Sequence, residues 1–537
     1  MKEPFFQDWV PTWLGNTLLF VLLLPMLSLG GIYTPTVGDL VGGLGTLSEY
    51  FIMANYCATI GMIVGATLLP VVMPWQPPHR LLGGTFLVLV LVHLGCVSTT
   101  SPLPIVALSF VGGLFKIFGM IILIPNLMVL LSPTGDRMQF YAIFNPIVIG
   151  VSQAVSVLSS YLAYYYNWQA VYAAFLPVLL VCLVLVLVAV RPVPKAPAPP
   201  TPAPPIDWLA AGLLTGALLL LAYVGAFGRL EDWWASPRIQ GASLLALVCA
   251  LGFTYRCLTQ ANPLVQFDIL GKGQVLLSCG LFIVLGIFLT GSSLLSSVTA
   301  GVLLLNGPTN AALNLWMIPG LVLGGGYCYW WFRRQRGFKG ILLLGFGAFV
   351  VSYGLLYLLI APNTSLPDLY VPTMLRGLGM AVLFVAGGVL INDKLAAADT
   401  SKVLFFQLLT RSLLGTLLFS TVFTTATYRA QVRNTTVLAQ SMDALDPLVL
   451  ARAQPAAQAA TASGRDPVVA TQQMLYGMVR PQAALLASRE LLGYVVWAGL
   501  GTLVFILLVR IAPLNRRRLV NWRRRLRGQS VLEVEGI

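Results

Sequence analysis

Charged residues are scarce in this sequence of 537 residues. Asp, Glu, Lys and Arg together make up 9% of it, against about 25% in soluble domains, whereas hydrophobic residues make up 58%. This composition excludes a soluble globular enzyme, a disordered chain and a coiled coil. At about 20 apolar residues per membrane crossing, the chain has room for a dozen or more membrane helices.

Histidine occurs only twice, and the seven cysteines are scattered through apolar runs without metal-ligand spacing. No glycine-rich phosphate loop followed by Lys and Ser or Thr is present, and His79 and His93 are the only bases available for a nucleophilic triad. We therefore predict that the protein is not an enzyme and binds neither a metal nor another cofactor.

Acidic residues are fewer than basic ones, 18 against 32, which gives a net charge of +14. Much of the positive charge lies in short loops and in an arginine-rich tail, Arg516–Arg527, directly after an apolar run. Such a tail is typical of attraction to an anionic cytoplasmic leaflet, so the charge does not indicate nucleic-acid binding.

Apolar runs long enough to cross a bilayer occur fourteen times, and we predict that each is a helix because lipid offers no partner to open backbone groups. The predicted spans are 14–36, 50–71, 81–99, 105–131, 140–162, 169–190, 208–227, 241–259, 274–296, 308–332, 340–361, 371–392, 403–427 and 491–511. The first is preceded by no basic region or cleavage site, so we interpret it as a span and not as a signal peptide.

Loop charges predict the orientation. The loops after the even-numbered spans contain Arg80, Arg137, Arg191, Lys195, Lys272, Arg333, Arg334, Arg336, Lys339, Lys394 and Lys402. Among the short loops on the other side, only Arg229 and Arg238 break this pattern. By the positive-inside rule, both termini lie in the cytoplasm.

The Pro/Ala-rich linker 191–206 divides the chain. It separates an N-terminal six-helix bundle, 1–190, from two inserted helices, 207–262, and a C-terminal six-helix bundle, 263–511. Within the last, the polar segment 428–488 is predicted to form amphipathic helices on the extracytoplasmic side, with apolar residues such as Leu438, Met442 and Leu445 on one face. Residues 512–537 are the basic cytoplasmic tail. The predicted fold is an all-α integral membrane protein of the transporter type.

A short internal repeat supports two equivalent bundles. Lys116 precedes Gly119-Met120 by three residues, and Arg376 precedes Gly379-Met380 in the same way, eight spans later. Parallel repeats of this kind characterise secondary transporters that bind their substrate midway between the halves. We therefore expect Lys116 and Arg376 to face one central cavity from opposite halves.

Several segments match a known family in order and spacing. They are Ile206-Asp207-Trp208-Leu209, Gly228-Arg229-Leu230-Glu231-Asp232-Trp233, Asn262-Pro263-Leu264-Val265, Asn167-Trp168, Thr410-Arg411 with Gly415, and Arg489-Glu490. The sequence thus resembles the fourteen-helix drug:proton antiporter branch of the major facilitator superfamily, the multidrug efflux type. The resemblance implies two six-helix bundles plus two inserted helices, and in some relatives a periplasmic membrane-fusion adaptor.

The antiporter motifs of that family are degraded. The stretch Leu27–Thr34 in the first span and the loop ending in Arg80 lack the usual acids, and Asn145-Pro146 replaces the glycine-proline motif of the fifth span. Lys116 lies roughly where the family has Arg. The resemblance therefore implies transport but leaves the coupling ion open between protons and another ion.

Charged residues inside membrane spans are costly, which makes them functional candidates. The candidates for substrate binding or ion coupling are Lys116, Arg376, Arg411, Glu49, Tyr56, His93, Asn145, Gln153 and Glu490. For each, an alternative stays open: snorkelling or helix-to-helix pairing for the cations, a solvated helix start for Glu49, and packing for His93 and the polar residues.

We predict a secondary active transporter in the bacterial inner membrane, most simply a gradient-driven exporter of amphipathic or aromatic small molecules by alternating access. One alternative is a solute importer of the same fold, and another is a non-transporting membrane scaffold or sensor. The segment 428–488 could act as a lid, dock a periplasmic adaptor or be an idle loop.

Overall fold

The computed structural model describes residues 5–28, 33–73, 76–132, 136–192, 207–260, 262–334, 336–392, 395, 400–440, 447–464 and 466–509. The linker 193–206, the tail from 510 onward with Arg516–Arg527, and Lys394, Met442 and Leu445 lie outside the described residues. Helices, joined by short turns and loops, make up the described part, and the one β-type pairing in it is an isolated bridge between Phe6 and Val190.

The N-terminal part contains α1 (Thr12–Ser28), α2 (Val37–Leu44), α3 (Ser48–Val72), α4 (Pro78–Ser98), α5 (Pro102–Leu131), α6 (Arg137–Tyr165) and α7 (Trp168–Ala189). The inserted pair is α8 (Trp208–Phe227) and α9 (Pro237–Thr259), joined through the 3₁₀ turn η2 (Trp233–Ala235). The C-terminal part contains α10 (Gly273–Gly301), α11 (Gly307–Leu313), η4 (Asn314–Trp316), α12 (Met317–Arg333), α13 (Phe338–Leu359), α14 (Tyr370–Asn392), α15 (Thr400–Leu408), the π-helical turn η7 (Leu409–Leu414), α16 (Gly415–Gln440), α17 (Pro447–Ala462) and α18 (Pro467–Leu508).

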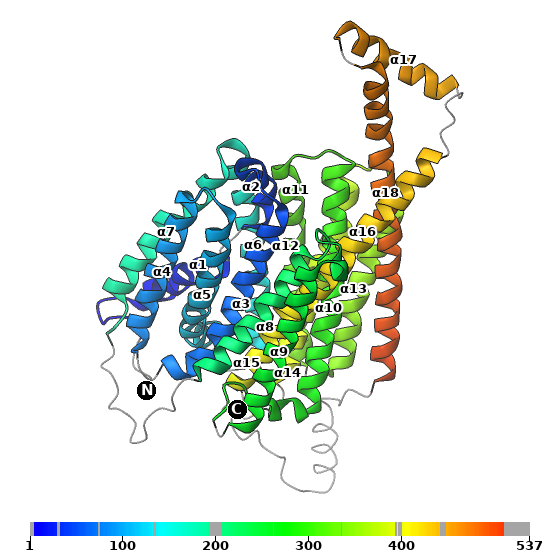
Figure 1. Ribbon diagram of the computed structural model, residues 1–537. Coiled ribbons are helices and arrows are strands. Elements are labelled where there is room, and N and C mark those ends of the chain that lie inside the picture. Colours follow the sequence, from blue (N-terminus) through cyan, green and yellow to red (C-terminus); the bar gives the residue numbers. More distant parts are fainter. Residues whose placement is uncertain are drawn as a thin grey trace.

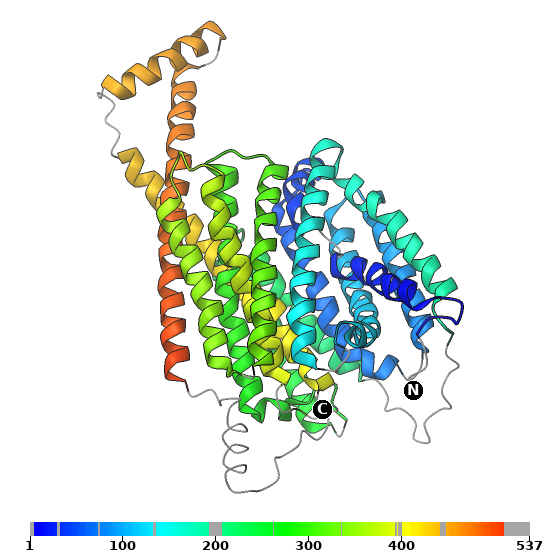
Figure 2. The same ribbon diagram turned by 180° about the vertical axis from the view of Figure 1, so that it is seen from behind.

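Thirteen helices of the described part are long and apolar enough to cross a membrane. The fourteenth, α1, has 17 residues and is about 26 Å long at 1.5 Å per residue, a little short of a 30 Å hydrocarbon core. It lies obliquely across its neighbours in both views (Figures 1 and 2). The predicted span 14–36 was wrong at its end, because Thr34–Thr36 is a separate 3₁₀ turn leading into α2.

Successive helices alternate in direction, so the molecule has two ends (Figure 1). We call the end where α2 and α11 lie the upper end, and the end where α18 finishes the lower end. The N-terminal bundle (α1 and α3 to α7) and the C-terminal bundle (α10 to α16 and α18) stand side by side. One apolar core lies within the N-terminal bundle, and a second fills the C-terminal bundle and extends to the inserted pair and to parts of α3 and α6. The inserted pair packs on α3 of one bundle and on α16 of the other.

The two bundles repeat one packing pattern. In the N-terminal bundle α3 packs most extensively on α5, and α4 packs on α7. In the C-terminal bundle the equivalent helices do the same: α12 packs on α14, and α13 on α18. This correspondence, with the inserted pair between the halves, confirms the predicted fold class.

Glycines allow α3 and α5 to approach closely. A Cβ atom on Gly61 would overlap the backbone of Phe110, and a Cβ atom on Gly113 would overlap the carbonyl of Ala58. Helices in lipid associate through such small residues because no hydrophobic effect drives them together. Glycine is therefore required at both positions by the distance between the helix backbones.

The same contact recurs between α12 and α14. A Cβ atom on Gly320 would overlap the backbone of Met374, and one on Gly377 would overlap the carbonyl of Met317. Gly377 thus occupies in the C-terminal bundle the place of Gly113 in the N-terminal bundle.

This register corrects the repeat expected from the sequence. When Gly113 is superposed on Gly377, Arg376 corresponds to Gly112, and Lys116 lies one helical turn further along its helix. The short motif had matched Lys116 to Arg376 because both precede a Gly-Met pair. Backbone packing, which the motif does not report, sets the true register.

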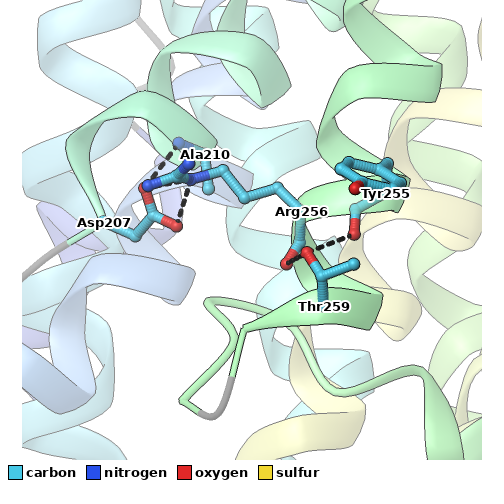
Figure 3. A network of polar contacts seen from close by, with 5 residues as sticks. All are labelled: Asp207, Ala210, Tyr255, Arg256 and Thr259. Carbon is cyan, nitrogen blue, oxygen red and sulfur yellow. Dashed lines mark hydrogen bonds and ion pairs between the residues drawn. The ribbon is translucent and has the colours of Figure 1, made fainter.

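An ion pair closes the inserted pair at its lower end (Figure 3). Asp207 caps α8 by accepting a hydrogen bond from the backbone N–H of Ala210 at 3.0 Å, and Nε of Arg256 in the last turn of α9 lies 2.6 and 2.8 Å from its two carboxylate oxygens. Partial burial works to raise the pKa of Asp207, but the hydrogen bonds from Arg256 and Ala210 outweigh burial and hold this pKa below its ordinary value.

The described residues of the segment 428–488 are mostly helical, and two of the helices, α16 and α18, continue predicted spans. The upper part of α16 and the first half of α18 extend beyond the other helices, and α17 packs on α18 at the top (Figures 1 and 2). We call this part, residues 428–440, 447–464 and 466–489, the projection. It rises from the edge of the C-terminal bundle and not from the middle of the molecule.

Candidate functional site

Helix α6 is the main contact of the N-terminal bundle with the C-terminal bundle, where it packs on α11, α12 and α14. Close approach to α12 depends on Gly325, where a Cβ atom would lie 2.6 Å from Cγ of Pro146 and 2.8 Å from the carbonyl oxygen of Ala142. Residues on the adjoining face of α6 therefore lie at the boundary between the bundles.

Arg411 lies at this boundary, in the π-helical turn η7 that interrupts the thirteenth span. Its guanidinium carbon is 4.0 Å from the centre of the Phe384 ring on α14, a cation–π contact. The charge also interacts with Tyr141 on α6, in the other bundle. A π-turn widens a helix by one residue and often marks a functional position, and here it presents a cation between the two halves.

Asn145 lies one turn along α6 from Tyr141, on the same side of the helix. Its side chain is 4% exposed, and Nδ2 has no hydrogen-bond partner among the described residues. A buried amide without a partner requires an explanation, and a bound water or ligand is the usual one. We call Tyr141, Asn145, Phe384 and Arg411 the Arg411 cluster.

Tyr56 marks a second contact between the bundles. It is buried on α3 and lies against Ser420 of α16. The lower part of the same boundary is closed by α15 and η7, which also pack on α3. The sequence-predicted candidates Tyr56, Asn145 and Arg411 thus lie on helices that meet between the halves.

Lys116 is 9% exposed in the middle of α5. Ser109 and Leu123, which are buried two turns before and two turns after it, share its side of the helix. Within the described part of the chain, no hydrogen bond or ion pair involves its ammonium group. A buried cation without a protein partner is costly, so Lys116 remains a candidate for a ligand contact.

Arg376 is held inside the C-terminal bundle. Its Nη2 donates a hydrogen bond to Oδ1 of Asn314 at 2.6 Å and lies 3.2 Å from the sulfur of Met317, and its side chain is 5% exposed. No described contact brings it together with Lys116. Because Arg376 joins α14 to η4, its observed role is to hold these elements together.

Glu49 is buried at the start of α3 and paired with Arg229, whose Nη2 lies 3.3 Å from Oε1. Arg229 belongs to the turn after α8, and its guanidinium also lies 5.8 Å from the ring of Tyr428 on α16. The expected alternative of a solvated helix-start acid was wrong, because the Glu49 side chain is 8% exposed. The ion pair also explains why Arg229 can lie on the side whose short loops contain no other Lys or Arg except Arg238.

The remaining candidates, His93, Glu490 and Gln153, lie away from the Arg411 cluster in the contacts that the structure describes. His93 is buried, with Nδ1 2.9 Å from the carbonyl of Leu89 and Nε2 3.4 Å from the hydroxyl of Tyr33, as in the packing alternative. Glu490 forms an ion pair with Arg433 of α16. Gln153 is half-buried on α6.

The electrostatic balance of the described spans is positive. Their acids are Glu49 and Asp368 in first turns and Glu490 near the upper end, whereas Lys116, Arg376 and Arg411 lie deeper. No group of three His, Cys, Asp or Glu residues in the described part could hold a metal. This excess of positive charge inside the described spans favours an anionic ligand.

Sequence reasoning missed Tyr141 and Phe384. Neither belongs to a charged or polar pattern, and an aromatic residue in an apolar helix gives no signal of its own. The π-turn that aims Arg411 at Phe384 has no sequence signature either.

No family model and no curated protein matches the sequence. Solved structures do match. The chain is similar to the nucleoside transporter NupG, with 10% identity over 92% of this chain and 98% of that chain and a TM-score of 0.50. It is also similar to an auto-inhibited POT family peptide transporter, with 14% identity over 94% of this chain and 98% of that chain and a TM-score of 0.53.

The chain has a major-facilitator-type fold. At these identities the likeness concerns the fold alone and does not distinguish the multidrug antiporter branch from others. Within that fold, the Arg411 cluster lies at the boundary of the two halves, where such transporters bind their substrates.

Proposed function

We propose that this protein is a secondary transporter that exports anionic amphipathic or aromatic small molecules across a bacterial inner membrane by alternating access. The observation that carries the proposal is the Arg411 cluster, in which the Arg411 cation packs on the Phe384 ring and interacts with Tyr141 across the boundary between the bundles, one turn along α6 from the unsatisfied amide of Asn145. Ligand sites combine apolar walls with a few polar groups in this way, and a guanidinium suits carboxylate or sulfonate groups.

Orientation supports the direction of transport. Arg80, Arg137, Lys272 and Arg334 lie at helix ends or in connections at the lower end, which the positive-inside rule assigns to the cytoplasm together with both termini. A cytoplasm-negative potential favours the outward movement of an anion by about 2.3 kcal/mol per charge at 100 mV, equivalent to a gradient of roughly 50-fold. Export of an anion therefore requires no coupling proton, in keeping with the lack of acids deep in the described spans.

Dye release from proteoliposomes tests the proposal. Vesicles loaded with a fluorescent aromatic sulfonate receive an interior-negative potential from a potassium gradient and valinomycin, and matched vesicles contain a cationic aromatic dye. We expect the potential to accelerate sulfonate release several-fold, with no effect on the cation, and we expect Arg411→Gln to remove the acceleration.

The rival functions give different results. Release driven by a proton gradient but not by potential would indicate proton antiport, and proton-driven uptake of a solute would indicate an importer. A protein that is folded but moves no compound of a broad panel in either direction would be a scaffold or sensor.

For the projection we propose a partner-binding role, with a periplasmic membrane-fusion adaptor as the partner. Its position at the edge of the C-terminal bundle suits a docking element better than a lid. Exposed apolar residues occur along it, among them Val437, Val468 and Tyr476. Replacing 435–480 by a short Gly/Ser linker should abolish export from intact cells while leaving release from proteoliposomes unchanged. Full export from cells would contradict the role.

A further inference from the structure

A pocket of about 720 Å³ lies at the upper end, away from the boundary between the bundles. Three elements form it: η2 of the inserted pair, the upper part of α16, and α18 near Glu490. The lining residues are Trp233, Trp234, Thr421, Val422, Thr425, Ala426, Arg429, Ala430, Arg433, Glu490, Leu491 and Tyr494.

The turn between α8 and α9 holds Trp233 and Trp234 in the wall of the pocket. Asp232 and Trp233 have φ angles of 52° and 56°, in the left-handed region that residues other than glycine rarely adopt. Trp233 stacks on Trp234 with ring centres 6.0 Å apart, and Gln240 donates a hydrogen bond to the carbonyl of Trp234 at 2.7 Å. Backbone strain persists only where surrounding contacts impose it, so the position of the two rings is fixed.

Hydrogen bonds to Glu231 hold the same turn. The hydroxyl of Tyr223 donates to Oε1 at 2.7 Å, and the hydroxyl of Ser236 donates to Oε2 at 2.9 Å. These bonds hold the pKa of Glu231 below its ordinary value, so the carboxylate is ionised at neutral pH and keeps both bonds.

The charge of the pocket is unbalanced. Arg433 forms an ion pair with Glu490, which also accepts a hydrogen bond from the hydroxyl of Tyr494 at 3.2 Å. Arg429 is exposed on the same wall and has no hydrogen bond or ion pair within the described residues. One positive charge is therefore left for a ligand.

The depth of the pocket matches a lipid head group. The turn that carries Trp233 and Trp234 joins α8 and α9, which are 20 and 23 residues long and reach from one bilayer surface to the other. Indole rings prefer this interfacial level. Below it the wall continues with apolar side chains such as Val422 and Leu491, and Val422 is 58% exposed, so the pocket is open to neighbouring acyl chains.

We propose that this pocket binds one anionic glycerophospholipid, of the phosphatidylglycerol class, from the leaflet at the upper end. Its phosphate pairs with Arg429, its glycerol region lies on the tryptophan pair, and an acyl chain follows Val422 and Leu491. Guanidinium groups bind phosphate strongly. The lipid would join the inserted pair to the C-terminal bundle.

Fluorescence quenching in vesicles tests the site. The protein has twelve tryptophans, so the signal of the pair is taken as the difference between the protein and a Trp233→Phe/Trp234→Phe variant. The quencher is phosphatidylglycerol or phosphatidylcholine with bromine on the acyl-chain carbons nearest the head group. The two lipids are added at matched mole fractions. We expect half-maximal quenching at a several-fold lower fraction of the phosphatidylglycerol.

Two variants test whether Arg429 causes the preference for phosphatidylglycerol. Arg429→Gln should bring the preference for phosphatidylglycerol close to one, whereas Arg489→Gln should keep it. Arg489 lies at the same height but packs over the Tyr357 ring, 5.1 Å from its centre, and does not line the pocket. Equal quenching by the two lipids in the unaltered protein would overturn the proposal, as would a preference that survives Arg429→Gln.

Native mass spectrometry gives a second measurement that does not depend on fluorescence. After partial delipidation the unaltered protein should retain one more phosphatidylglycerol than Arg429→Gln, and as many as Arg489→Gln. The same number of lipids on all three proteins would overturn the site.

Discussion

Arg229 lies 3.3 Å from Glu49 and thereby joins the turn after α8 to the first turn of α3. The inserted pair is thus attached by charge to the N-terminal bundle, and through the Arg229–Tyr428 contact to the C-terminal bundle as well.

Removal of Arg229 alone should destabilise the protein more than removal of both partners. In Arg229→Met the buried Glu49 carboxylate loses its countercharge, which costs about 2–3 kcal/mol. The double variant Glu49→Gln/Arg229→Met leaves only a neutral amide there, so thermal unfolding in detergent should show a partial recovery. Additive losses would mean that the ion pair does not couple the two sites.

Arg411 and Arg376 should separate transport from stability. Arg376→Met leaves Asn314 without its partner, so we expect a lower unfolding temperature, with a loss of about 1–3 kcal/mol. Arg411→Gln loses a single cation–π contact, so its unfolding temperature should change little, whereas release of an aromatic sulfonate should fall at least tenfold. The reverse pattern would contradict the assignment of Arg411 to the substrate site.

Lys116→Met should make the protein more stable and less active. An apolar side chain of similar length removes the cost of a buried cation, about 1–3 kcal/mol. If Lys116 contacts the transported anion, the release rate falls in the same variant, a trade-off typical of functional sites. A lower unfolding temperature would instead indicate that the ammonium group has a structural partner.

Gly113→Ala should loosen the N-terminal bundle, because the added Cβ would overlap the carbonyl of Ala58. Overpacking of this kind costs about 1–3 kcal/mol. The matched control is Gly150→Ala on α6, where nothing lies within 4 Å of the added atom. Equal unfolding temperatures for the two variants would contradict the close contact between α3 and α5.

The Asp207–Arg256 pair should stabilise the protein over the whole neutral range. The pKa of Asp207 is lower in the folded protein than in the unfolded chain. The stabilisation by the ion pair is therefore complete above about pH 4 and is lost only as the pH falls through the lowered pKa of Asp207. Asp207→Asn keeps a helix cap and removes the charge, so it should lower stability by about 1 kcal/mol. The difference should be constant from pH 5 to 8. A difference that already shrinks between pH 7 and 5 would point to another titrating group.

The sequence predicted what depends on composition and length. The thirteen long helices, the inserted pair after 191–206 and the equivalence of the two bundles follow from apolar runs of about 20 residues and their order. The first predicted span, 14–36, was too long because no charged residue interrupts the sequence between its start and Asp39, whereas the structure has the separate 3₁₀ turn Thr34–Thr36 at its end.

The contacts of individual side chains could not be predicted from composition and length. Arg376 and Lys116 looked alike in their motifs, but Arg376 has Asn314 as its partner, and Lys116 lies one turn out of register. The position of Arg411 in its span gave no sign of its contact with Phe384, because the direction of its side chain depends on the η7 turn. A motif records neighbours along the chain, whereas these roles depend on neighbours on other helices.

Helix α18 has 42 residues and runs without a break from the projection to the lower end. The part before Glu490 is about 35 Å long at 1.5 Å per residue, so it acts as a rigid arm fixed to the C-terminal bundle. For every degree by which that bundle tilts, the tip of the arm moves by about 0.6 Å, by simple trigonometry on that length. A molecule that holds the tip still would therefore also hold the bundle at one angle.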